Sequence, residues 1–179
     1  MWARLKNQLG GLAKREDGGS IIELAIMFPV LLLLFVGAAE LGRLFYTYNT
    51  LAKGCNVGAR YLSASRNAVN GTSTQIADEK TKAKNLVVCG IASTSATACD
   101  GQTPIVTGLT TANVNICDNF AVACSPALPA STTKYFRVEI TGYTFSTGVF
   151  NLASKTGQAN SKFYFTLKPG VEQRYIPSS

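Results

Sequence analysis

The stretch DGGSIIELAIMFPVLLLLFVGAA, residues 17–39, decides the fold class of this chain. From Leu24 to Ala39 it contains no charged residue. An α-helix rises about 1.5 Å per residue, so residues 20–39 would span about 30 Å, the thickness of a bilayer core. A helix that is apolar all round belongs in lipid or in a large core, and 179 residues are too few for a large core. The stretch therefore predicts a transmembrane helix.

Two other structures produce similar apolar runs, namely a buried core helix and a removable secretory signal. A secretory signal has an apolar region of about 7–15 residues, followed by a small-residue cleavage site. Here the run is longer, and residues 40–46, ELGRLFY, keep a helical pattern, so we expect the anchor to stay. Residues after about 42 should lie outside the cytoplasm, because four basic residues precede the run: Arg4, Lys6, Lys14 and Arg15.

Glu23 and Pro29 are the two unusual residues within the apolar run. A carboxylate in the membrane costs free energy, so Glu23 suggests a function and requires a cation. No basic residue lies one helical turn away, at 19, 20, 26 or 27, so that cation must come from elsewhere. Pro29 cannot donate a hydrogen bond to the carbonyl of Ala25, so we expect a kink in the helix here. Neighbouring segments that pack against the kink would cover the freed carbonyl.

The helical pattern continues beyond the apolar run to about Ser63. Apolar residues recur there at steps of three and four, and we expect this stripe to pack against the exterior domain: Leu41, Leu44, Phe45, Tyr48, Leu51, Ala52, Cys55, Ala59 and Leu62. The chain would then consist of a basic cytoplasmic leader (1–18), a transmembrane helix that continues as an amphipathic helix (19–63), and an exterior domain (64–179).

The exterior sequence predicts an α+β domain with a second helix and a small antiparallel sheet of about three strands. Residues 67–73, rich in Asn, Gly and Ser, predict a loop, and residues 74–88 predict the helix. Alternating apolar and polar residues predict strands at 112–117, 134–144 and 162–167.

Two further expectations concern the connections of this domain. The segment 148–159 is too long for a tight hairpin turn and is expected to carry a short helix at 149–153. The tail after Pro169, GVEQRYIPSS, is expected to be irregular.

Five cysteines indicate an oxidising compartment, because four of them lie in the expected exterior region. Four cysteines allow three connectivities, and local pairing of Cys89 with Cys99 and of Cys117 with Cys124 costs least in loop closure. Cys55 is left over on the apolar stripe and is expected to be a buried free thiol, with an intermolecular bridge as the alternative. A metal site is not expected, since the spacings do not fit zinc and the chain has no histidine.

The sequence also argues against catalysis and nucleic-acid binding. Without histidine there is no Ser-His-Asp or Cys-His arrangement, and no glycine-rich phosphate loop with a lysine occurs, so we expect neither an enzyme nor a cofactor. The net charge is +7, but its basic residues are scattered rather than clustered on one face. The densest group, Lys80, Lys82 and Lys84, is expected to form a solvated helix face.

The segment DGGSIIELAIMFPVLLLLF resembles a type IV prepilin signal, in which cleavage follows a glycine and glutamate is the fifth residue of the mature chain. Together with residues 40–46 and the GARY sequence at 58–61, it resembles the TadE-like minor pilins, or pseudopilins, of the tight-adherence (Tad) pilus. The resemblance covers about residues 18–63.

This resemblance implies that a prepilin peptidase cuts between Gly18 and Gly19, which places Glu23 fifth. A cut after Gly19 would place Glu23 fourth. It also implies that the new amine of Gly19 pairs with Glu23 when subunits pack. The implied partners are other pilin subunits, the pilus assembly platform, the peptidase and membrane lipid. The implied location is the bacterial inner membrane, with the exterior domain in the periplasm, or the pilus. The alternative is an uncleaved, signal-anchored adaptor or adhesin.

Overall fold

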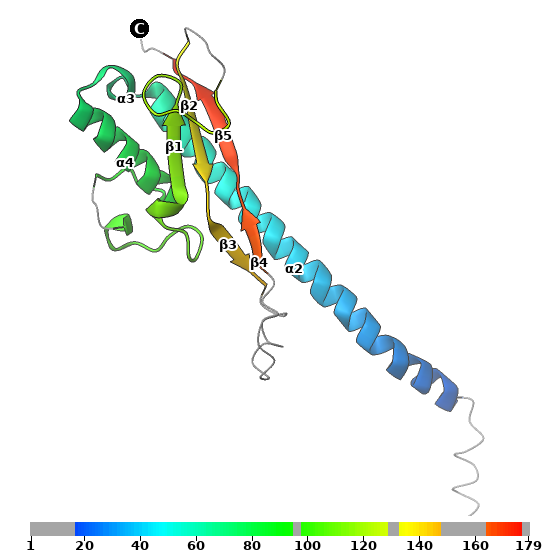
Figure 1. Cartoon of the computed structure of the whole chain (residues 1–179). Helices are drawn as coiled ribbons and strands as arrows, with labels where there is room; N and C mark the ends of the chain where they lie inside the picture. The colour runs from blue at the N-terminus through cyan, green and yellow to red at the C-terminus, as the bar shows by residue number, and fades with distance from the viewer. Residues whose placement is uncertain (1–16, 95–97, 129–132, 148–163, 177–179) are drawn as a thin grey trace, which may run out of the picture. The chain divides into compact units, whose positions relative to one another are not determined.

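The computed structural model describes residues 17–94, 98–128, 133–147 and 164–176, and it has the α+β architecture that the sequence predicts (Figure 1). Its helical elements are α2 (Asp17–Ala64), α3 (Asn67–Asn70), α4 (Ser73–Cys89) and the short 3-10 turns η1 (Ala98–Gly101) and η2 (Thr111–Asn113). Its strands are β1 (Val114–Asp118), β2 (Tyr135–Ile140), β3 (Tyr143–Ser146), β4 (Tyr164–Leu167) and β5 (Gly170–Arg174). The chain divides into two compact units, and the boundary falls within α2 between Gly42 and Arg43.

The strands form two antiparallel sheets instead of the one sheet expected. Strand β2 is the centre of a three-stranded sheet with the order β1-β2-β5, and β3 pairs with β4 alone. The single strand predicted over 134–144 is therefore wrong. It is interrupted at Gly142, which has a φ of +71°, a conformation that glycine adopts without strain. This turn sends β2 and β3 to different partners.

The irregular tail expected after Pro169 is also wrong, because residues 170–174 form β5. Its side chains alternate between half-buried and exposed, and the Arg137 side chain on β2 donates hydrogen bonds to Glu172 on β5. The polar sequence GVEQR gives a weak strand signal on its own. Pairing with β2 supplies the missing stabilisation.

Helix α4 agrees closely with the helix predicted at 74–88. Thr72 caps its N-terminus, accepting from the Gln75 amide while the Gln75 side chain accepts from the Thr72 amide. Gly90 ends the helix with a φ of +76°. The loop expected at 67–73 is partly wrong, because Ala68 and Val69 are buried within the helical turn α3.

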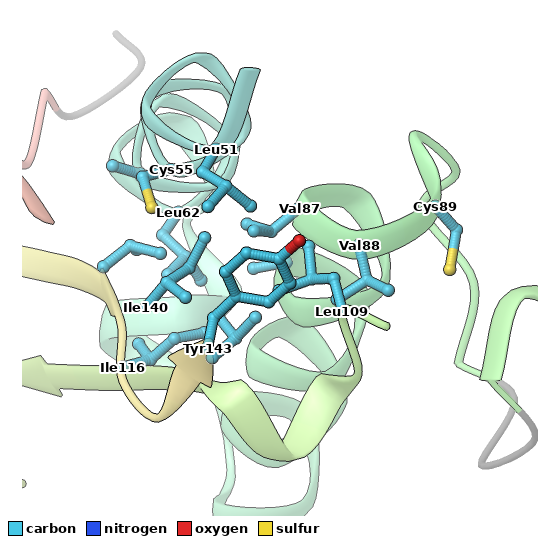
Figure 2. Close-up of a cluster of buried hydrophobic side chains, with 14 of the residues drawn as sticks. Leu51, Cys55, Leu62, Val87, Val88, Cys89, Leu109, Ile116, Ile140 and Tyr143 are labelled. Carbon is cyan, nitrogen blue, oxygen red and sulfur yellow. The ribbon is translucent and has the colours of Figure 1, made fainter. Parts of the chain in front are cut away.

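The core of the second unit lies between α2, α4 and the sheets (Figure 2). Helix α2 contributes four buried residues from the predicted stripe: Leu51, Cys55, Ala59 and Leu62. They pack with Val87 and Val88 of α4 and with Ile116 and Ile140 of the sheet. The earlier part of the stripe does not enter this core fully, because Leu44 is only partly buried and Phe45 and Tyr48 are exposed.

Two glycines allow α4 to approach α2 closely. A Cβ at Gly54 would lie 3.0 Å from the Val87 carbonyl oxygen, and a Cβ at Gly58 would lie 2.5 Å from Val87 Cγ2. Val87 is itself almost fully buried and has little room to move. The contact between the helices therefore depends on the absence of side chains at these two positions.

Candidate anchor and assembly segment

The apolar run forms the first part of α2, and its side chains are exposed. The large apolar residues from Ile21 to Phe35 have exposed fractions between 46% at Leu32 and 75% at Phe35. An 18-residue window of α2 has a mean hydropathy of 2.6, and none of this window is buried. By length and composition, α2 can cross a membrane once or serve as an N-terminal signal. Removing a Leu or Phe side chain from water contributes about 1.5–3 kcal/mol, so this surface favours an apolar environment outside the chain.

The expected processing site lies at the beginning of α2. The Gly18–Gly19 bond lies within α2, which the structure describes from Asp17 onward. A Cβ at Gly19 would meet no atom within 4 Å. Among the described residues, the backbone is therefore open on the side where a Cβ of Gly19 would lie.

Glu23 lies one turn after this bond and is exposed among apolar side chains. Within the described part of the chain, the ion pairs involve other carboxylates and none reaches Glu23. An anionic group on an apolar helix can attract a cation from a neighbouring molecule. Pro29 lies six positions further along, inside α2, and the helix continues on both sides of it.

The GARY residues at 58–61 contribute to the packing of α2 against α4 in the second unit. Ala59 is fully buried, and the Tyr61 hydroxyl donates a hydrogen bond of 2.8 Å to Glu79 on α4. Burial and this bond raise the pKa of Tyr61 to about 12. Sequence reasoning used these residues only as a family signature, and the structure gives them a packing role.

Glu79 is a buried carboxylate that three donors satisfy. Besides Tyr61, the Ser65 hydroxyl and the Lys82 ammonium donate to it, both at 2.9 Å. Burial acts to raise the pKa of Glu79, but these hydrogen bonds outweigh it, and the pKa is lowered. Residue type and local spacing indicate no role for Glu79, and only its neighbours in space reveal one.

Asp118 at the end of β1 is a second buried carboxylate that the sequence did not indicate. Its Oδ1 accepts from the amides of Phe120, Ala121 and Val122, and its Oδ2 accepts from Lys80 at 3.0 Å. Burial acts to raise the pKa of Asp118, and the backbone and lysine hydrogen bonds lower it below its usual range. The solvated lysine face expected at 80–84 is therefore wrong for Lys80, which pairs with a buried partner.

The structure joins Cys89 to Cys99 and Cys117 to Cys124, with Cα atoms 5.3 Å and 5.2 Å apart. These are the local pairs that loop closure favours. The second bridge closes the loop whose amides bind Asp118. Cys55 is a buried free thiol that donates to the Pro169 carbonyl at 3.6 Å. Burial raises its pKa to about 12, which keeps it protonated and unreactive.

Within the described residues, no group of three or more cysteines and acids is arranged to hold a metal ion. The described part of the chain thus combines an exposed apolar helix segment that begins next to Glu23 with a second unit that satisfies its own buried acids. Such an arrangement is suited to insertion and association.

Comparison with known proteins finds no match among curated proteins and none among solved structures. A protein-family comparison does find a match, and it starts at Gly18 and ends at Arg60. The matched region contains the apolar run, Glu23, Pro29 and most of the part of α2 that packs into the core. Residues 18–60 match the family described as TadE-like protein, which confirms the resemblance inferred from this stretch of the sequence.

Proposed function

We propose that the chain is a minor pilin, or pseudopilin, that takes part in the assembly or initiation of a Tad-type pilus. The observation that carries the proposal is the TadE-like match over the exposed apolar helix. TadE-like proteins are components of Tad pilus systems and are not enzymes. The exposed helix and its acid suit a subunit that associates with other subunits.

The proposed assembly step depends on Glu23 and on the amine at Gly19. A prepilin peptidase cuts between Gly18 and Gly19 and creates a positively charged α-amino group. In an apolar environment, this amine and a carboxylate attract each other much more strongly than in water. The amine of one subunit then pairs with Glu23 of a neighbour, so that only processed chains associate.

The proposed topology follows from charge and redox chemistry. The basic leader stays in the cytoplasm, residues 19–42 cross the inner membrane once, and the second unit lies in the periplasm. Two disulfides in this unit agree with an oxidising compartment. Lipid, other pilin subunits and the pilus assembly platform are the proposed neighbours.

Processing is tested by mass spectrometry of the N-terminus after expression of the full chain with an active prepilin peptidase. We expect Gly19 as the first residue. Gly18→Leu should block processing, because the peptidase must approach the backbone there, whereas Gly11→Leu in the leader should not. Recovery of chains that begin only at Met1 would contradict the proposal, and chains that begin at Ser20 would place the cut one residue later.

Association is tested by co-purification of the membrane-extracted chain with other pilin subunits. Glu23→Ala should reduce co-purification strongly while the protein still inserts into the membrane. Asp78→Ala removes an exposed acid from α4 and serves as the matched control. If the two variants associate equally well, Glu23 has no role in assembly.

A signal-anchored adaptor or adhesin that is never cleaved is the second candidate. The helical conformation at Gly18 and Gly19 favours it, because a bond inside a helix is a poor protease substrate until the helix unwinds. In this case Met1 is retained and Glu23→Ala leaves association unchanged. The two experiments above therefore separate the two functions.

A further inference from the structure

A polar groove of about 470 Å³ lies in the second unit, between the beginning of its α2 segment, the 105–107 loop and β3. Its volume is within the range of about 300–1,000 Å³ that small-molecule sites occupy. Hydroxyl groups and one guanidinium dominate its polar lining, which includes Arg43, Tyr46, Thr47, Thr107, Thr144 and Ser146. None of the described residues that line it is an acid.

Two contacts hold the walls of this groove in place. The Arg43 guanidinium lies over the Phe145 ring, 5.7 Å from its centroid. The Tyr143 hydroxyl donates a 3.3 Å hydrogen bond to the Thr107 carbonyl, which ties the loop to β3. Arginine presents planar donors that suit phosphate oxygens, and hydroxyls can both donate and accept. The lining is therefore complementary to a phosphate group that carries further hydroxyls.

The position of Arg43 along the chain limits what can reach the groove. Arg43 follows Ala39, the last residue of the apolar run, by four residues, which rise about 6 Å in a helix. The headgroup layer on each side of the hydrocarbon core is about 5–8 Å thick. Tyr46, which lines the groove, is 75% exposed, and tyrosine is enriched at membrane interfaces. If α2 crosses the membrane, the groove opens within reach of lipid headgroups.

We propose that this groove binds the headgroup of an anionic phospholipid, with Arg43 on the phosphate and the hydroxyl side chains on the headgroup alcohol. Phosphatidylglycerol fits this chemistry, because its glycerol offers hydroxyls and no cation. The choline group of phosphatidylcholine is a bulky cation without hydrogen-bonding groups and fits it poorly. The inference requires only that α2 spans the membrane, and it is independent of processing and of Glu23.

The experiment uses the full chain reconstituted in bilayers that contain spin-labelled lipid, and electron paramagnetic resonance measures the lipid that the protein immobilises. The wild-type chain should prefer phosphatidylglycerol to phosphatidylcholine. Arg43→Gln should reduce this preference about fivefold, the effect of one basic residue near an anionic surface. Arg60→Gln removes the same charge from an exposed position on α2 outside the groove and should keep the preference.

Thr144→Val tests the groove without changing any charge. Thr144 is exposed on β3, so the variant should fold normally. Loss of one hydrogen bond to the headgroup should still reduce the preference for phosphatidylglycerol about threefold. The proposal is overturned if Arg43→Gln or Thr144→Val keeps the wild-type preference, or if Arg60→Gln loses as much as Arg43→Gln. Displacement of the labelled lipid by millimolar inorganic phosphate would also overturn it. If neither lipid is immobilised, both the membrane span and the groove are wrong.

Discussion

The two parts of α2, before and after the unit boundary at Gly42, contain similar residues in opposite surroundings. Leu34 is 66% exposed, whereas Leu51 is 1% exposed. A Cβ at Gly37 would meet nothing within 4 Å, whereas one at Gly58 would collide with Val87. The second part of the helix finds its partners within the chain, and the first part does not find them among the described residues.

The acidic residues of the two units also differ in their surroundings. Asp118 and Glu79 lie among donors that the second unit itself provides. Glu23 is exposed on an apolar helix. The second unit therefore supplies the partners of its own buried acids, whereas Glu23 in the first unit lies on an exposed apolar surface. The predictions below compare matched variants in the two regions.

The largest effect should come from the two acids. Asp118→Ala leaves Lys80 and three backbone amides without their acceptor, and removal of one partner of a buried pair costs about 3–5 kcal/mol. Glu23→Ala should leave the unfolding of the second unit unchanged. Thermal unfolding of the detergent-solubilised chain, followed by near-ultraviolet circular dichroism, measures both. A similar loss of stability in the two variants would contradict the claim that the second unit depends on Asp118 and not on Glu23.

The next effect should come from the leucines. Leu51→Ala opens a cavity in the core, which costs about 2–5 kcal/mol. Leu34→Ala shortens a side chain that the chain does not bury, so the stability of the second unit should not change. Urea unfolding in the same detergent gives both values. Equal midpoints for Leu51→Ala and the wild type would show that α2 is not part of this core.

A smaller effect should come from the glycines. Gly58→Ala pushes a methyl group against Val87, and overpacking of this kind destabilises a fold by about 1–3 kcal/mol. The higher helix propensity of alanine offsets up to about 1 kcal/mol of this loss. Gly37→Ala meets no obstacle and gains only the helix propensity. The shift in the thermal midpoint measures the difference. If Gly58→Ala raises the midpoint, the close approach of α4 is not required.

The smallest effect should be the response to acid. The pKa values of Glu79 and Asp118 are lowered in the folded state, so their contribution to stability is fully present above the unfolded pKa values, near pH 4. This contribution is lost as the pH falls through the folded pKa values. The midpoint of the second unit should therefore decrease below about pH 4, and less so in Glu79→Gln. An identical acid response in this variant would contradict a folded-state role for the Glu79 carboxylate.

The amino-acid sequence by itself determined the long apolar helix, the α+β class, the helix predicted at 74–88 and the resemblance of residues 18–60 to the TadE-like family. These features depend on local composition and spacing: an uninterrupted apolar run is apolar in any fold, and the Thr72–Gln75 capping box lies within one turn. Glu23 stood out for the same reason, because a single acid in such a run contrasts with its immediate neighbours.

Only the tertiary structure decided the division into two sheets, strand β5, the roles of Glu79, Asp118 and Lys80, and the groove beside Arg43. Each of these depends on residues that are distant in sequence, such as Lys80 and Asp118 or Arg137 and Glu172. Burial and hydrogen bonding of such residues depend on which segments meet in space. Residue type and local periodicity do not contain that information.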